Sequence, residues 1–150
     1  MEAVTTLRTL ARQVLGAFLI VTGTGHLSFA RTEFQAQVPS WIPVDADRVV
    51  VVSGVAELVL GLALLAAPQR WRGRVGWVVA AFLVAIFPGN LAQWAEGRDA
   101  FGLDSDAARA VRLVFQPVLV AWALWSTGAW REWRRTAQSG STGRPRRADS

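Results

Sequence analysis

An apolar run at residues 49–67 contains a single charged side chain, that of Glu57. As a helix, this run would be about 28 Å long, close to the thickness of the hydrocarbon core of a membrane. A carboxylate in the middle of such a span costs about 2.5–3.5 kcal/mol on insertion scales, so a membrane helix that carries one usually turns it towards a partner or a cavity. We therefore expect a membrane-spanning helix with Glu57 facing the interior of the protein.

Three other long stretches contain no Asp, Glu, Lys or Arg: residues 13–30, 75–95 and 113–130. A helix on the surface of a soluble bundle carries charged residues along one face, and these segments have none to place there. The sequence therefore predicts one all-α domain, a four-transmembrane-helix bundle at residues 1–136, followed by a disordered basic tail at residues 137–150. The expected membrane spans are at about residues 13–30, 49–67, 75–95 and 108–130.

The composition argues against several kinds of site. The chain has no Cys, which removes thiolate metal ligands, cysteine nucleophiles and disulfide exchange from its own chemistry. Its single His is too few for a haem held by two His of one protomer or for a structural zinc site, so we expect no metal and no covalently bound cofactor. The net charge of +5 lies in the loops and the tail of a membrane protein, so we expect no nucleic-acid partner.

The basic residues are distributed unequally between the two ends of the predicted bundle. The N-terminal segment, the second loop and the tail hold 11 of the 16 arginines. The first and third loops, with the adjoining helix turns, hold the other 5 beside 7 acidic residues. The positive-inside rule therefore places both termini in the cytoplasm, and we expect a multi-pass protein of the bacterial inner membrane.

This topology puts the polar residues of the spans in the outer half of the membrane. They are His26, Glu57, Asn90, Gln93, Arg112 and Gln116. The i,i+4 spacing of Arg112 and Gln116 places both on one face of a helix. We expect Glu57 to pair with Arg112 across the second and fourth spans, because a paired carboxylate and guanidinium is far less costly in lipid than either alone. His26, Asn90 and Gln116 would complete the hydrogen bonds.

Two interpretations of this polar layer stay open on the sequence alone. In the structural interpretation, the layer fixes the register of the helices. In the functional one, it lines an outward-facing pocket for a head group or a quinone-like ring, and His26 or Glu57 moves protons. The ligand-binding candidates are His26, Glu57, Asn90, Arg112 and Gln116, and the sequence identifies no catalytic residue.

Short motifs in the spans and in the first loop are similar to those of a known protein family. They are Gly25-His26 with Phe29, Val38-Pro39 with Pro43, Ser53-Gly54-Val55-Ala56-Glu57 with Gly61, Phe87-Pro88-Gly89-Asn90, and Arg112-Leu113-Val114-Phe115-Gln116 followed by Trp122 and Trp125. Together these motifs, which cover about residues 10–127, resemble the DoxX-like family of small bacterial membrane proteins. The resemblance implies four transmembrane helices and a link to membrane redox chemistry. The family takes its name from a subunit associated with a quinone-reducing thiosulfate oxidoreductase, and some relatives act in complexes with thiol or superoxide defence enzymes.

The leading functional hypothesis is an accessory membrane subunit, without catalytic activity of its own, whose pocket binds a quinone or lipid-like molecule and supports a membrane oxidoreductase. One alternative is an oligomeric transporter of small solutes or protons. The other is a structural scaffold that recruits partners through its arginine-rich tail. The expected partners are the lipid bilayer, the membrane oxidoreductase and further copies of the chain in a homo-oligomer.

Overall fold

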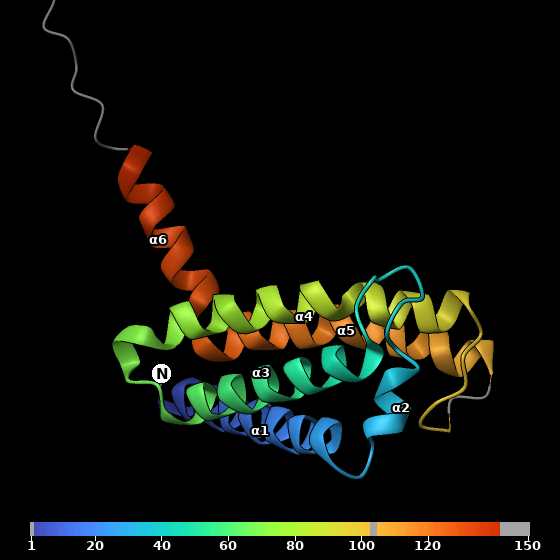
Figure 1. Ribbon diagram of the computed structural model, residues 1–150. Coiled ribbons are helices and arrows are strands. Elements are labelled where there is room, and N and C mark those ends of the chain that lie inside the picture. The colour runs from blue at the N-terminus through green and yellow to red at the C-terminus, as the bar shows by residue number, and fades with distance from the viewer. Residues whose placement is uncertain (1, 103–104, 142–150) are drawn as a thin grey trace, which may run out of the picture.

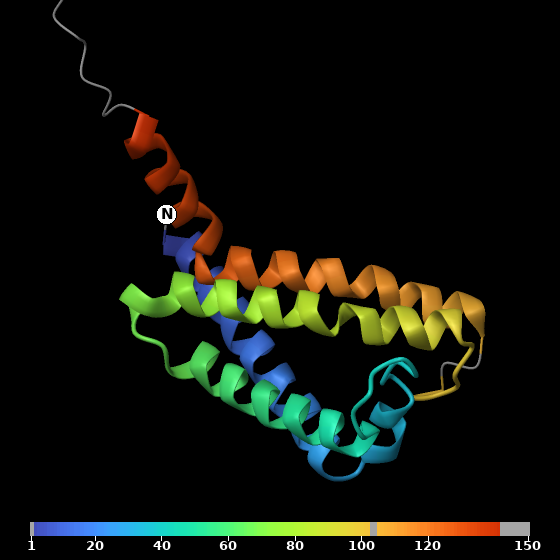
Figure 2. The ribbon, with the colours of Figure 1, turned by 45° about the horizontal axis from the view of Figure 1, so that its top comes forward.

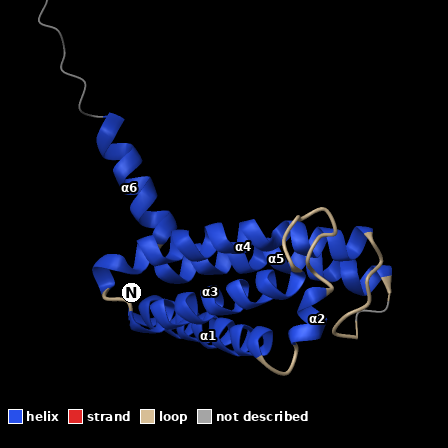
Figure 3. Ribbon diagram, in the orientation of Figure 1, coloured by secondary structure: helices blue, strands red, loops and turns tan. Residues whose placement is uncertain are grey.

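The computed structural model describes residues 2–102 and 105–141, and in that part of the chain it consists of helices and loops (Figures 1 and 3). The elements are α1 (Glu2–Leu27), α2 (Arg31–Gln35), α3 (Ala46–Ala66), the short 3₁₀ helix η1 (Gln69–Trp71), α4 (Arg72–Ala95), α5 (Asp106–Thr127) and α6 (Ala129–Ser141). Helices α1, α3, α4 with η1, and α5 are long and apolar enough to cross a membrane. The predicted fold class, an all-α four-transmembrane-helix bundle, is confirmed.

The helices differ in extent from the expected segments. Helix α1 begins well before residue 13, because the basic residue Arg12 does not interrupt it: Arg12 is buried and donates from Nη1 to the Leu65 carbonyl at the end of α3 (3.3 Å). The first loop contains the short helix α2 before its two prolines. Helix α6 continues to Ser141, so residues 137–141 of the expected disordered tail are helical, and residues 142–150 lie outside the described part.

The bundle is made of two closely packed helix pairs, α1 with α3 and α4 with α5 (Figure 2). Glycines bring α1 and α3 together, as small residues commonly do in membranes. A Cβ atom built on Gly61 would lie 2.7 Å from the Gly16 carbonyl oxygen, and one on Gly54 would lie 3.0 Å from the Gly23 carbonyl oxygen. No larger side chain fits at these positions without moving the helices apart.

The two pairs meet in an apolar core in the middle of the bundle. It consists of Leu15, Leu19, Leu64, Val79, Leu83, Leu119 and Ala123. The Trp122 indole on α5 donates to the Ala11 carbonyl on α1 (2.9 Å) and ties the pairs together near the N-terminal end. Helix α3 contacts α4 much less than it contacts α1. The pairs can therefore leave space between them in the half of the bundle away from the N-terminus.

The loops at that end of the bundle are joined to one another by polar contacts. Arg31 of α2 forms a two-pronged ion pair with Asp47 at the start of α3, and Asp47 also accepts from Gln35 (2.9 Å). The hydrogen bond with Asp47 raises the pKa of the Arg31 guanidinium, so Arg31 stays charged in this contact at neutral pH. Arg98 donates to the Val38 carbonyl (2.8 Å) and joins the third loop to the first. These loops form a roof over the space between the helix pairs.

Candidate functional site

A cavity of about 600 Å³ lies between the two helix pairs beneath this roof. All five predicted ligand-binding residues line it: His26 from α1, Glu57 from α3, Asn90 from α4, and Arg112 and Gln116 from α5. Each spanning helix thus contributes at least one polar side chain to one space. The expectation that the polar residues of the spans meet at one level of the bundle agrees with this arrangement.

On the α4–α5 side, the polar residues form a continuous hydrogen-bonded chain. Arg112 donates from Nε to Asn90 Oδ1 (3.2 Å), and Asn90 donates from Nδ2 to Gln116 Oε1 (3.0 Å). Gln116 donates in turn from Nε2 to the backbone carbonyl of Leu83 (2.6 Å). Asn90 and Gln116 are both buried, so each amide is fixed at both its oxygen and its nitrogen. This side of the cavity is rigid, and it presents the outer nitrogens of Arg112 as donors.

On the α1–α3 side, the polar residues are buried but poorly satisfied. Glu57 is only 5% exposed, and its closest ionisable neighbour is His26, with 4.0 Å between Oε1 and Nε2. Glu57 Oε2 and His26 Nδ1 have no hydrogen-bond partner within the described part of the chain. Buried polar atoms are nearly always paired in folded proteins, so two such atoms at the wall of one cavity need an explanation.

The predicted direct pair between Glu57 and Arg112 is wrong. The two charges attract one another, but no hydrogen bond or ion pair joins them, and they face the cavity from different helix pairs. Glu57 lies on the α1–α3 pair, beside His26. Arg112 is held on the other pair by Asn90 and by the ring of Phe101, whose centroid lies 5.3 Å from the guanidinium carbon. The cavity separates the two charges.

A row of aromatic rings closes the cavity under the loops, and the sequence did not reveal it. The ring of Phe34 in α2 packs edge-on against His26, with 3.5 Å between centroids, and against Phe101, with 4.7 Å. Phe101 adopts a positive φ of 57°, and its backbone N–H donates to Glu33 Oε2 (2.7 Å). Phe34 lies in a helix of only five residues and Phe101 in a turn, and neither segment is long enough for periodicity to show which side chain turns inward.

One residue of the predicted polar layer lies outside the site. Gln93 is 1% exposed, but it does not line the cavity. Its Nε2 donates to the Arg98 carbonyl (3.4 Å), so it supports the third loop instead. Among the described residues, no group of three or more His, Asp or Glu side chains is placed to hold a metal ion. The site is therefore a mixed cavity: apolar walls, a fixed guanidinium on one side, and a carboxylate beside an imidazole on the other.

No curated protein and no solved structure matches this chain. The resemblance to the DoxX-like family stays a prediction. A family model described as "Domain of unknown function (DUF8561)" matches residues 15–127, which extend from the middle of α1 to the end of α5 and contain the whole lining of the cavity. The protein is a multi-pass membrane protein that belongs to this DUF8561 family.

Proposed function

We propose that this protein is an accessory membrane subunit, without catalytic activity of its own, whose cavity binds a quinone or lipid-like molecule for a membrane redox partner. One observation carries the proposal: Glu57 and His26, each with a buried atom that lacks a hydrogen-bond partner, line the same cavity as Arg112, and Arg112 forms no ion pair with Glu57. A purely structural polar layer would bring these groups into contact, since each unpaired buried charge is costly. Here they are held apart by the packing of two helix pairs.

The dimensions and lining of the cavity suit a ring with polar groups at its two edges and an apolar tail. A volume of about 600 Å³ is typical of small-molecule sites, which are mostly apolar with a few fixed polar groups. Arg112 would donate to one carbonyl oxygen of a quinone ring. His26 or Glu57, when protonated, would donate to the other. The apolar wall that remains includes Phe18 and Phe115, and it would hold the isoprenoid chain.

Proton transfer is the chemistry that these side chains offer to such a ligand. Reduction of a quinone takes up protons as well as electrons, and His26 beside Glu57 is a pair that can hold and release a proton near the ring. The electrons would come from the partner oxidoreductase. The link to redox chemistry rests on the DoxX-like resemblance, and it makes this chain a ligand-holding subunit rather than the enzyme.

The proposed location is the bacterial inner membrane, with both termini in the cytoplasm. The arginine distribution supports this orientation through the positive-inside rule. The cavity would then open near the outer surface. The apolar core that contains Leu15, Leu64 and Val79 separates the cavity from the cytoplasmic end of the bundle. A single chain therefore lacks a continuous polar path, and the transporter alternative finds no support in the described helices.

The test is to purify the protein from its native membrane in a mild detergent, extract it with organic solvent and identify isoprenoid quinones by mass spectrometry. We expect a quinone in near-stoichiometric amount with the wild type. Arg112→Gln and Glu57→Gln should each lose most of it, because each removes one of the polar groups that faces the ligand. Circular dichroism of both variants verifies that they are folded.

Arg48→Gln is the matched control, because Arg48 is an exposed arginine of α3 that does not line the cavity. It should retain the wild-type amount of quinone. Absence of any isoprenoid from the wild type would contradict the proposal, and so would equal amounts in Arg112→Gln and Arg48→Gln.

A further inference from the structure

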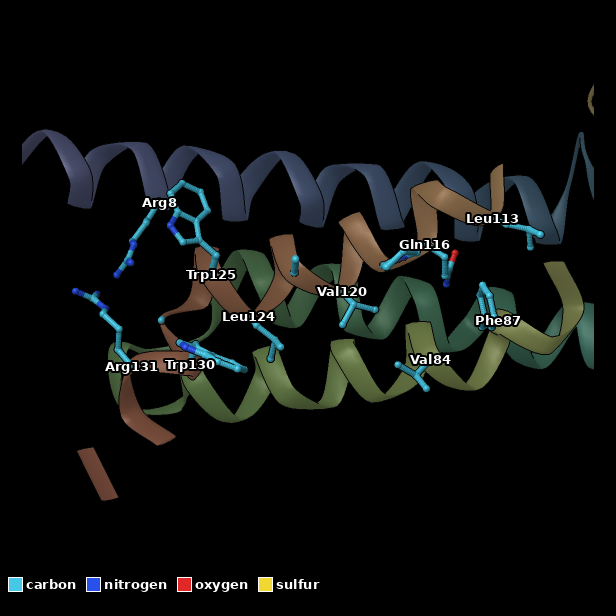
Figure 4. A pocket seen from close by; sticks show the side chains of 13 residues that line it. Arg8, Val84, Phe87, Leu113, Gln116, Val120, Leu124, Trp125, Trp130 and Arg131 are labelled. Atoms are coloured by element: carbon cyan, nitrogen blue, oxygen red, sulfur yellow. The ribbon is translucent and has the colours of Figure 1, made fainter. Parts of the chain in front are cut away.

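A second groove, of about 630 Å³, runs along α5 on a different side of the α4–α5 pair (Figure 4). Its walls are apolar over most of their length. They comprise Val84 and Phe87 of α4, Leu113, Pro117, Val120, Ala121, Leu124 and Trp125 of α5, and Trp130 of α6. Gln116 also touches this groove, but its amide is already bonded to Asn90 and Leu83.

Two arginines from distant parts of the sequence meet at one end of the groove. Figure 4 shows the side chains of Arg8, from α1, and Arg131, from α6, directed towards the same opening. Their positive charges repel each other. Nε and Nη1 of Arg8 are buried without a hydrogen-bond partner, and neither arginine forms an ion pair with a carboxylate among the side chains that the structure describes.

We propose that this groove binds an anionic phospholipid, with its phosphate between Arg8 and Arg131 and one acyl chain along α5. Guanidinium groups bind phosphate oxygens through paired, charge-assisted hydrogen bonds, and two of them facing one opening fit a single phosphate. A negative headgroup would also relieve the repulsion between the two arginines. The proposal is independent of the quinone site, because the two ligands would share only the wall at Gln116.

The length of the groove agrees with a lipid that enters from the membrane leaflet at the arginine end. From Leu113 to Leu124 the apolar wall on α5 extends about 17 Å at 1.5 Å per residue. One leaflet of the hydrocarbon core is about 15 Å thick. Trp125 and Trp130 lie at the arginine end, at the depth where tryptophans of membrane proteins meet the headgroups. Basic pockets between membrane helices are known binding sites for acidic headgroups.

The experiment measures the thermal unfolding of delipidated, detergent-purified full-length protein by circular dichroism, with added phosphatidylglycerol or with phosphatidylcholine of the same acyl chains. We expect phosphatidylglycerol to raise the Tm clearly more than phosphatidylcholine does. Arg8→Gln and Arg131→Gln should each remove most of that excess shift. Arg131 is exposed, so the second variant keeps the test valid even where the first unfolds. Sodium phosphate alone should give no shift, because it lacks the acyl chain.

Arg70→Gln is the matched control: Arg70 is an exposed arginine at the same end of the bundle and does not line the groove. It should keep the full excess shift. Equal shifts with the two lipids in the wild type would overturn the proposal. A loss in Arg70→Gln as large as that in Arg131→Gln would also overturn it, because it would indicate attraction to the general positive charge of this end. A shift with sodium phosphate alone that matches the lipid would overturn the acyl-chain part of the site.

Discussion

Glu57 and Arg112 differ in how well the surrounding protein satisfies their charges. Glu57 is buried with one oxygen that lacks a hydrogen-bond partner and with His26 4.0 Å away. Arg112 is half-buried, bonded to Asn90 and stacked near Phe101. The same change of a charge to an amide should therefore affect the two positions in opposite directions.

Glu57→Gln should leave the ligand-free protein as stable as the wild type or more stable by about 1 kcal/mol, because it removes a buried charge that forms no ion pair with an arginine. Arg112→Gln should lower the free energy of unfolding by about 1 kcal/mol, because it breaks the bond to Asn90 and the contact with Phe101. Unfolding of the delipidated proteins, followed by tryptophan fluorescence, compares the two. Equal destabilisation by both changes would indicate the direct ion pair that the structure lacks.

The residues of the site could be predicted from the sequence more fully than their contacts. Glu57, Asn90 and Gln116 stood out because polar groups inside apolar spans are costly and turn inward. The direct pairing of Glu57 with Arg112 could not be tested on the sequence, because it depends on how far apart the helix pairs stand. Phe101 gave no signal either, since its orientation is set by a loop with a positive φ and by a bond to Glu33.

Among the elements, the α1–α3 pair determines where the cavity lies. Glycines on both helices let the backbones approach closely, while α3 and α4 have little contact. Membrane helices were predictable from four uncharged or singly charged runs, and the glycines of α1 and α3 were visible as small residues. The division of the bundle into two pairs could not be predicted, because several helices carry glycines and the sequence does not show which of these glycines form the close contact.

Gly61→Val should separate α1 from α3, because its Cβ would lie 2.7 Å from the Gly16 carbonyl oxygen and 2.8 Å from Ile20 Cγ1. We expect a loss of about 1–3 kcal/mol in the free energy of unfolding, as for other overpacked sites. Circular dichroism during denaturation measures it. Ala66→Val adds two methyl groups at an exposed position of the same helix and should change stability little. A similar loss in both variants would show that the glycine contact is unimportant.

At the scale of the whole molecule, four crossings place the N-terminus and α6 at one end of the bundle and the loop roof at the other (Figure 1). The arginine-rich end then carries the proposed phospholipid groove, and the roofed end carries the candidate quinone cavity. We propose from the charge distribution, through the positive-inside rule, that the arginine-rich end faces the cytoplasm.

Cysteine labelling tests this orientation directly, because the chain contains no Cys of its own. Ser40 lies in the roof and Gln69 at the opposite end, and both are exposed. In intact cells whose outer membrane has been made permeable to the reagent, Ser40→Cys should react with a maleimide that does not cross the inner membrane. Gln69→Cys should react only after the inner membrane is broken. The reverse pattern would place the cavity at the cytoplasmic surface.

The central claim is that the space between Glu57 and Arg112 holds a ligand. Native mass spectrometry of the detergent-purified protein measures this most directly. Ser53→Phe places a phenyl ring in the cavity without changing any charge, whereas Val52→Phe puts the same ring on the neighbouring exposed position of α3. We predict a bound molecule of one defined mass on the wild type and on Val52→Phe, and none on Ser53→Phe. A wild type that is always empty, or a bound molecule that persists in Ser53→Phe, would contradict the account.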